Sequence, residues 1–213
     1  MKKYTFTTYN IYKTKRPTCM ETVKTLCAVN DFLALQEWVD IVDIPQELNT
    51  ASCTTFIMPF RNIQTGTALV SKIQPSTSYG ILSKEKEVKF HTRKSMMVGT
   101  YPIDHGTLTI FSCHALNFVT NGMWRRNMDQ WMAYIPATGR VIFAGDFNTW
   151  NKGRFTYLDE KLKAIGFTYA HFEHKGFLKL DHIWVRDVSI LSTLCDYTIP
   201  ASDHYPVTLT FTI

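Results

Sequence analysis

The feature that most constrains the fold is an apolar run that stops abruptly at a carboxylate and an amide. Residues Val141 to Ala144 are apolar, Gly145 follows, and Asp146 and Asn148 come next, two residues apart. A short apolar run bounded by glycine is typical of a buried strand. Because side chains alternate along extended chain, Asp146 and Asn148 are predicted to point to the same side of the strand end. The alternative is a strand followed by an ordinary polar turn.

A chain of 213 residues is long enough for one sizeable domain, and we predict a single domain over 1–213. Hydrophobic residues make up 45% and charged residues 19%, which excludes the disordered class. The five cysteines lack the close pairs of metal knuckles or disulfide frameworks, so reduced, buried thiols in a cytoplasmic protein are expected. No signal peptide or membrane span is expected. The net charge of +5 favours a polyanionic partner only weakly.

The rest of the pattern predicts layered α/β construction. Strands are expected over 4–11, 31–38, 54–58, 66–73, 95–101, 107–113, 181–188 and 206–213. Helices are expected over 18–30, 121–134 and 155–165. Thr18 and Glu21 match a capping box at the first helix, and Gly166 closes the third. Residues 102–106 suit a hairpin turn. Two halves of strands plus helices are predicted to pack as a sandwich of sheets with helices outside.

Five further polar clusters stand near strand ends. With the first they are, in chain order, Asn10, Gln36-Glu37, His114, Gly145-Asp146-Phe147-Asn148, Leu180-Asp181-His182 and Ser202-Asp203-His204. Each motif alone arises often by chance, but six in this order and spacing are specific. They resemble the endonuclease/exonuclease/phosphatase superfamily over essentially the whole chain, from Tyr9 to Val207. The resemblance implies an α/β (α+β) protein with a four-layer α/β/β/α sandwich, the DNase I-like fold, and metal-dependent cleavage of phosphate esters.

The chemistry explains why the resemblance assigns these residue types. A phosphodiester is anionic with a poor leaving group, so its hydrolysis needs charge neutralisation, a positioned water and a proton donor. The implied cofactor is a hard cation, Mg²⁺ or Mn²⁺, which selects oxygen ligands. Glu37 is the foremost expected metal ligand, together with Asn10 and Asp203. Asp146 would orient the attacking water or accept its proton, and Asn148 would fix the water or a phosphate oxygen, unless both bind a second metal.

Two histidines complete the implied catalytic set. His204 would contact the phosphate, as general base or as clamp, with its tautomer and charge set by Asp181. His114 would give a proton or hydrogen bond to the leaving oxygen. The deoxyribonuclease and sphingomyelinase branches carry a histidine at this position, whereas Asn117, a candidate substrate contact, matches the apurinic endonuclease branch. His182 is assigned no role.

Basic and aromatic residues near the motifs predict a nucleic acid substrate. Arg93, Lys94, Arg125 and Arg126 are expected to meet phosphates, while Trp124 and Trp150 stack on exposed bases. The alternative places the arginines on a solvated helix face and the tryptophans in the core. We therefore predict a metal-dependent nuclease, most simply a DNA endonuclease. The alternatives are a phosphoesterase acting on a lipid headgroup or small phosphate ester, and a nonenzymatic binding module. The oligomeric state is not predicted.

Overall fold

The computed structural model describes residues 2–58, 61–87, 92–175 and 179–213. The helices are α1 (Cys19–Val29), α2 (Asn121–Met132) and α3 (Lys152–Ala164), and a short turn, η1, spans Tyr12–Thr14. The strands are β1 (Lys3–Asn10), β2 (Phe32–Trp38), β3 (Asn49–Met58), β4 (Arg61–Ser71), β5 (Thr77–Leu82), β6 (Ser95–Ile103), β7 (Gly106–His114), β8 (Arg140–Asp146), β9 (Thr168–Tyr169), β10 (Asp181–Arg186), β11 (Ser189–Cys195) and β12 (Val207–Thr212). All predicted elements are present, whereas β5, β9 and β11 were not predicted.

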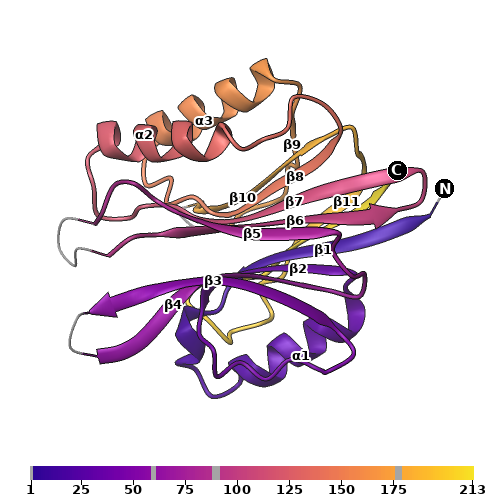
Figure 1. Ribbon diagram of the computed structural model, residues 1–213, viewed down its shortest axis with the longest axis horizontal. Helices are drawn as coiled ribbons and strands as arrows, with labels where there is room; N and C mark the ends of the chain where they lie inside the picture. The colour runs from indigo at the N-terminus through magenta and orange to yellow at the C-terminus, as the bar shows by residue number, and fades with distance from the viewer. Residues whose placement is uncertain (1, 59–60, 88–91, 176–178) are drawn as a thin grey trace.

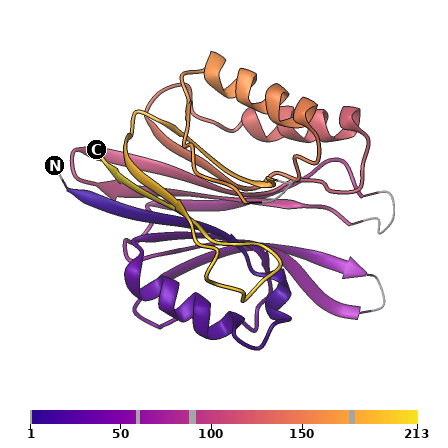
Figure 2. The same cartoon turned by 180° about the vertical axis from the view of Figure 1, so that it is seen from behind.

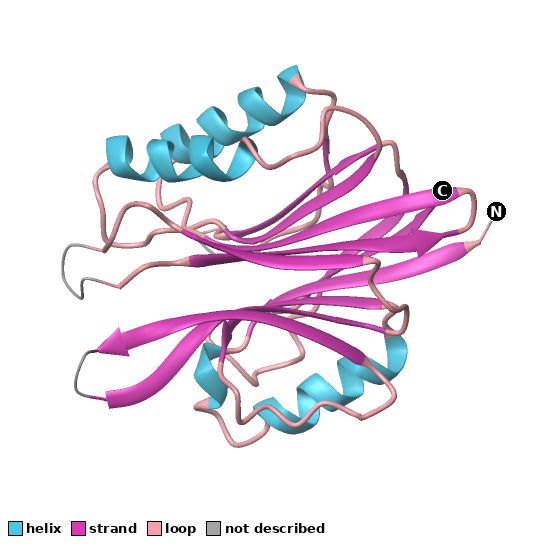
Figure 3. Ribbon diagram, in the orientation of Figure 1, coloured by secondary structure: helices cyan, strands magenta, loops and turns pink. Residues whose placement is uncertain are grey.

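In the described chain the strands form two six-stranded sheets that pack face to face (Figure 1). One sheet has the order β11-β12-β1-β2-β4-β3, and the other has the order β5-β6-β7-β8-β10-β9. Helix α1 covers the outer face of the first sheet, and α2 and α3 cover the outer face of the second (Figure 3). The predicted four-layer α/β/β/α sandwich is confirmed.

Three apolar layers hold these four layers together. Between the sheets the buried side chains include Phe6, Phe32, Leu69, Ile110 and Ile142. Beneath α2 and α3 they include Trp124, Trp131, Phe143, Phe147 and Trp184, and beneath α1 they include Val23, Leu26, Cys27, Leu35 and Val70. Burying one such aliphatic or aromatic side chain contributes about 1.5–3 kcal/mol. The predicted base-stacking role of Trp124 is wrong, because this side chain is fully buried and its Nε1–H donates to the Phe147 carbonyl (2.8 Å).

Strand pairing brings the predicted polar clusters to one edge of the sandwich. β1 and β2 are parallel with Asn10 opposite Gln36, and β7 and β8 are parallel with His114 opposite Asp146. Parallel neighbours end at the same edge, so their last side chains lie close together. β10 runs antiparallel to β8 and places Asp181 directly opposite Asp146. The chain ends lie side by side at the other end of the same layers (Figure 2), where β1 pairs with β12.

Local details confirm some predictions and correct one. Thr18 is the N-cap of α1, but it has helical backbone angles (φ −82°, ψ −4°) and its side chain makes no capping hydrogen bond, so the predicted capping box is absent. Gly166 follows α3 with φ +88°, as expected for a closing glycine. The five cysteines are free, and four of them are buried. No helix in the described ranges is long and apolar enough to cross a membrane.

Candidate active site

Asp146, at the end of β8, is the residue on which the candidate site converges. Its buried carboxylate accepts hydrogen bonds from Asn10 Nδ2 (3.0 Å) and from the backbone N–H of Asn148 (3.0 Å). Its Oδ2 lies 3.6 Å from His114 Nε2 and 3.8 Å from His204 Nε2. Side chains from both sheets and from the loop before β12 therefore meet at one carboxylate.

The turn after β8 brings Asn148 to Asp146 by a different geometry from the one predicted. Gly145 has φ +144°, and a Cβ there would lie 2.0 Å from the Cys113 carbonyl oxygen, so only glycine fits. Asn148 has φ 49°, in the left-handed region that asparagine tolerates. Its side-chain amide donates to the Ala115 carbonyl (2.9 Å). The two residues are close because the chain turns back after β8, and not because of the strand alternation from which their common side was predicted.

His204 and Asp181 form the predicted carboxylate and imidazole pair. His204 Nδ1 lies 2.7 Å from Asp181 Oδ2. Burial opposes the charged imidazole, but the Asp181 and Asp146 carboxylates outweigh it and raise the pKa of His204 to about 10. Burial also raises the pKa of Asp146 to about 6, an effect that His204 opposes and Asp181 reinforces. The site thus joins an imidazolium to a carboxylate that titrates close to neutral pH.

His114, at the end of β7, lies beside a cation. Lys94 Nζ is 3.1 Å from His114 Nε2, and burial together with the Lys94 and Lys13 ammonium groups holds the pKa of His114 well below its usual value. Lys94 Nζ also lies 3.5 Å from Oε1 of Glu87, a buried carboxylate. The sequence predicts Lys94 at the site but not Glu87, because an alternating run of charges such as that at 84–87 is ordinarily a solvated surface.

The expected metal ligands are only partly brought together. Glu37 lies where the register of β2 slips, with φ 54°, and its carboxylate accepts a hydrogen bond from the Lys13 ammonium. Asn10 is tied to Asp146, whereas Asp203 is exposed and accepts from the neighbouring Ser202 hydroxyl (3.2 Å). In the described ranges no three His, Cys, Asp or Glu side chains are grouped as a metal site.

The donor chemistry nevertheless suits a hard cation. The Glu37 carboxylate and the Asn10 amide supply oxygen atoms, which Mg²⁺ and Mn²⁺ prefer. The Lys13 ammonium already lies against Glu37, so this carboxylate is positioned to hold positive charge. Glu37 also has a positive φ of 54°. Such a backbone conformation is uncommon in a non-glycine residue and costs free energy, and residues that adopt it cluster at functional sites.

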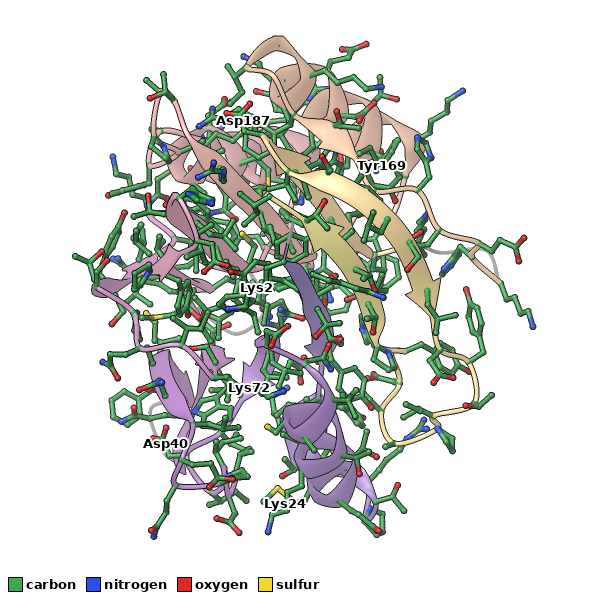
Figure 4. The ribbon with its side chains drawn as sticks, turned by 90° about the vertical axis from the view of Figure 1, so that its right-hand side faces the viewer. Lys2, Lys24, Asp40, Lys72, Tyr169 and Asp187 are labelled. Carbon is green, nitrogen blue, oxygen red and sulfur yellow. The ribbon has the colours of Figure 1, made fainter. Side chains whose placement is uncertain are left out.

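Two hollows flank the Asp146 cluster. The larger is a cleft of about 780 Å³, lined among others by Lys13, Lys15, Glu37, Arg93, Lys94, His114, Asn117 and Phe118. Asp40, which is labelled in Figure 4, also lines it. The smaller, of about 220 Å³, is lined by Asp181, Asp203 and His204 among others. Asp146 contacts a residue from each hollow, His114 on one side and His204 on the other.

The remaining predicted substrate contacts divide into two groups. Asn117 and Trp150 lie near the cleft, where Trp150 Nε1–H donates to Asn117 Oδ1 (2.5 Å) and its ring stacks on Phe118, with ring centroids 6.5 Å apart. Trp150 is 39% exposed and Phe118 is 60% exposed, so this aromatic pair faces solvent. Arg125 instead lies over the Tyr157 ring (4.8 Å) in the outer helix layer and does not line the cleft. The predicted phosphate contact of Arg125 is therefore corrected.

His182 is a core residue. Its Nε2 lies 2.7 Å from the Thr149 hydroxyl, its Nδ1 lies 3.0 Å from the Tyr169 hydroxyl, and burial lowers its pKa to about 3. Tyr169, labelled in Figure 4, belongs to β9. A neutral, hydrogen-bonded imidazole in an aromatic cluster has a structural role. This role is consistent with the sequence analysis, which assigns His182 no part in catalysis.

The fold and the site together define a class of protein. It is a four-layer sandwich in which a buried carboxylate, two imidazoles and an amide meet where the strands of both sheets end. The sequence model of the endonuclease/exonuclease/phosphatase family matches residues 7–204, and the chain belongs to this family. Its members are hydrolases that act on phosphoesters and generally use divalent metal ions.

The chain is similar to curated proteins and to solved structures along most of its length. A UPF0294 protein from Vibrio parahaemolyticus is 24% identical over 221 residues, which cover 96% of this chain and 76% of that protein. The endonuclease/exonuclease/phosphatase from Beutenbergia cavernae has a TM-score of 0.79 at 12% identity, covering 100% of this chain and 72% of that chain. D. rerio TDP2 complexed with a single-strand DNA product has a TM-score of 0.70 at 12% identity, with full coverage of both chains. At such identities the structural likeness shows the fold alone.

Proposed function

We propose that the protein is a metal-dependent phosphodiesterase that cuts DNA as an endonuclease. The observation that carries the proposal is the convergence of Asn10, His114 and His204 on the Asp146 carboxylate. The adjacent cleft is lined by four cationic side chains, Lys13, Lys15, Arg93 and Lys94, against the three carboxylates Glu37, Asp40 and Glu87, and this small excess of positive charge supports an anionic substrate. The DNA product in the TDP2 structure gives a precedent for such a substrate on this fold.

In this proposal Asp146 and the residues around it each have a distinct role in hydrolysis. Asp146, with a pKa of about 6, accepts a proton from the attacking water near neutral pH. The His204 imidazolium, fixed by Asp181, donates a hydrogen bond to a nonbridging phosphate oxygen. Asn10 and Asn148 hold the Asp146 carboxylate in its orientation.

The proposed cofactor is Mg²⁺ or Mn²⁺, held by Glu37 and Asn10 with Asp203 as a further ligand. When bound, a divalent ion neutralises the phosphate charge and polarises its P–O bonds. At this position the Glu37 carboxylate is half-buried and is paired with the Lys13 ammonium. Prior pairing lowers the cost of holding a carboxylate away from bulk water.

A plasmid-nicking assay tests the proposal. Supercoiled plasmid is incubated with the parent protein, with Asp146→Ala and with His204→Ala, each with Mg²⁺ and with excess chelator. We expect nicking by the parent only, dependent on the metal, with both variants reduced by at least about 10²-fold, as for loss of a general base. Arg125→Ala removes a cation that lies off the cleft and is expected to cut like the parent. Circular dichroism checks that each variant is folded, and parental nicking by both active-site variants refutes the assignment.

A phosphoesterase acting on a lipid headgroup or small phosphate ester is the second candidate. The supporting observation is the apolar rim of the cleft, where Ile41, Phe56 and Phe118 are 75%, 55% and 60% exposed. This function predicts metal-dependent turnover of phosphocholine or glycerophosphate esters and no salt-sensitive binding to DNA. Measuring both properties on one preparation distinguishes the two candidates.

A further inference from the structure

Lys94 is fixed more firmly than a solvated lysine. Its backbone N–H donates to Ser83 Oγ (3.0 Å), and its carbonyl accepts from the Ser83 N–H (2.8 Å). Its ammonium lies 3.5 Å from Glu87 Oε1, and Glu87 is only 4% exposed. A buried carboxylate without a cationic partner is strongly destabilising. The Glu87 charge therefore keeps the Lys94 ammonium at the wall of the cleft.

Glu87 is itself held by two segments, the one that follows β7 and the one that precedes β6. Its Oε1 accepts from the backbone N–H of Asn117 (2.8 Å), and its Oε2 accepts from the Thr92 hydroxyl (3.2 Å). Asn117 is three residues beyond His114. Glu87 thus sets the position of Lys94 relative to His114.

The donors and acceptors around His114 indicate which of its ring nitrogens carries the proton. An ammonium group has three donors and no acceptor, so the 3.1 Å contact between Lys94 Nζ and His114 Nε2 uses the Nε2 lone pair. The neutral ring then carries its proton on Nδ1. Nε2 is also the nitrogen that lies 3.6 Å from Asp146 Oδ2, so the imidazole nitrogen nearest the reacting centre has no proton to give.

From these contacts we infer that Lys94 is the catalytic acid that protonates the leaving oxygen, and that His114 and Glu87 are positioning residues. The inference rests on the function proposed above. Lys94 Nζ and Asp146 Oδ2 both contact His114 Nε2, so they are no farther apart than these two contact distances combined. A phosphate bound at this place would have its attacking water on the side of Asp146 and its leaving oxygen on the side of Lys94.

The step balances with one water. The water oxygen forms a bond to phosphorus and its proton passes to Asp146, while the bond between phosphorus and the leaving oxygen breaks. The leaving oxygen keeps the electron pair and takes a proton from the Lys94 ammonium. Solvent then reprotonates Lys94 and removes the proton from Asp146. Proton donation of this kind accelerates a reaction by about 10²–10⁴-fold.

The test compares leaving groups that do and do not need a proton. The substrates are a thymidine oligonucleotide, which releases an alkoxide, and the 5′- and 3′-(p-nitrophenyl phosphate) esters of thymidine, which release a stable phenolate. Lys94→Met is expected to lower kcat by about 10²-fold or more on the oligonucleotide and by less than about threefold on whichever nitrophenyl ester is turned over. Arg93→Met, which removes the neighbouring cleft cation, is expected to lower kcat/KM by similar factors on both kinds of substrate.

Lys94→Met alone leaves the Glu87 carboxylate buried without its partner, so the double variant Lys94→Met/Glu87→Gln is measured beside it. The double variant removes both charges and is expected to show the same selective loss. Equal losses on oligonucleotide and nitrophenyl ester refute the inference and make Lys94 a phosphate contact. Failure of the parent protein to hydrolyse either kind of substrate refutes the proposed function instead.

Discussion

Replacing Asp146 with asparagine preserves the shape of the side chain and removes a buried charge. The pKa of Asp146 is about 6, raised from 3.8 chiefly by burial. The folded state thus holds this proton more tightly than the unfolded state, so its contribution to stability is complete below pH 3.8 and is lost as the pH rises through 6. One pKa unit corresponds to about 1.4 kcal/mol, so ionisation of Asp146 lowers the free energy of unfolding by about 3 kcal/mol.

The Asp146→Asn variant has no carboxylate to ionise, so it does not lose this stability at higher pH. It does lose one hydrogen bond. The carboxylate accepts from Asn10 Nδ2 and from the Asn148 N–H, one on each oxygen, whereas a carboxamide has only one oxygen. The missing bond costs about 1 kcal/mol. We therefore expect the variant to be less stable than the parent by up to about 1 kcal/mol at pH 4 and more stable by about 2 kcal/mol at pH 6.5.

Urea unfolding at pH 4 and pH 6.5, with chelator present so that no cation compensates the charge, measures the effect. The upper pH avoids interference from His204, whose raised pKa of about 10 gives stability that is complete below pH 6.5 and is lost as the pH rises through 10. Asp104→Asn, which alters an exposed carboxylate, is the control and is expected to stay within about 0.5 kcal/mol of the parent at both values. A stability difference for Asp146→Asn that is the same at both pH values refutes burial of an ionised Asp146.

Two further predictions concern the charges around the site. Lys13→Met is expected to raise the affinity for Mn²⁺ about fivefold, because the ion no longer displaces an ammonium from Glu37, an exchange of about 1 kcal/mol. Calorimetric titration measures this, and unchanged affinity would show that Glu37 is not a ligand. Asp181→Asn is expected to lower the pKa of His204 from about 10 toward its usual value, because it removes the nearer of two carboxylates. An NMR titration follows the imidazole, and an unaltered pKa would assign the shift to Asp146.

The sequence predicts the interior of this fold well because buried strands leave continuous apolar runs. The strands that it misses lie at sheet edges or are very short. β5 and β11 are edge strands with mostly exposed side chains, so neither shows the apolar periodicity of a core strand. β9 contains two residues, too few for any pattern. Edge strands are stabilised by pairing with a neighbour, and that pairing has no local signature in the sequence.

The residues of the candidate site also fall into two groups, those that a local sequence pattern predicts and those that it does not. Asp146, Asp181 and His204 stand in short motifs, and the structure brings them together as expected from strand ends. Lys13 and Glu87 have no such motif, because their significance comes from contacts across the fold. Lys13 meets Glu37 from within a turn in which residues 12–14 all have positive φ, a geometry that no residue type in this turn indicates.

These two unpredicted residues explain why Asp146 in particular can exchange a proton. Glu37 and Glu87 are each compensated by a lysine ammonium, and Asp181 is compensated by His204 at 2.7 Å. The contacts of Asp146 are longer, at 3.6 Å to the neutral His114 and 3.8 Å to His204. Among these four carboxylates Asp146 therefore has the weakest compensation for its charge and is deeply buried. This weak compensation, together with burial, gives Asp146 a pKa near 6. Neutralising Lys13 or Lys94 is therefore expected to change the charge balance around Asp146, although neither lysine contacts it.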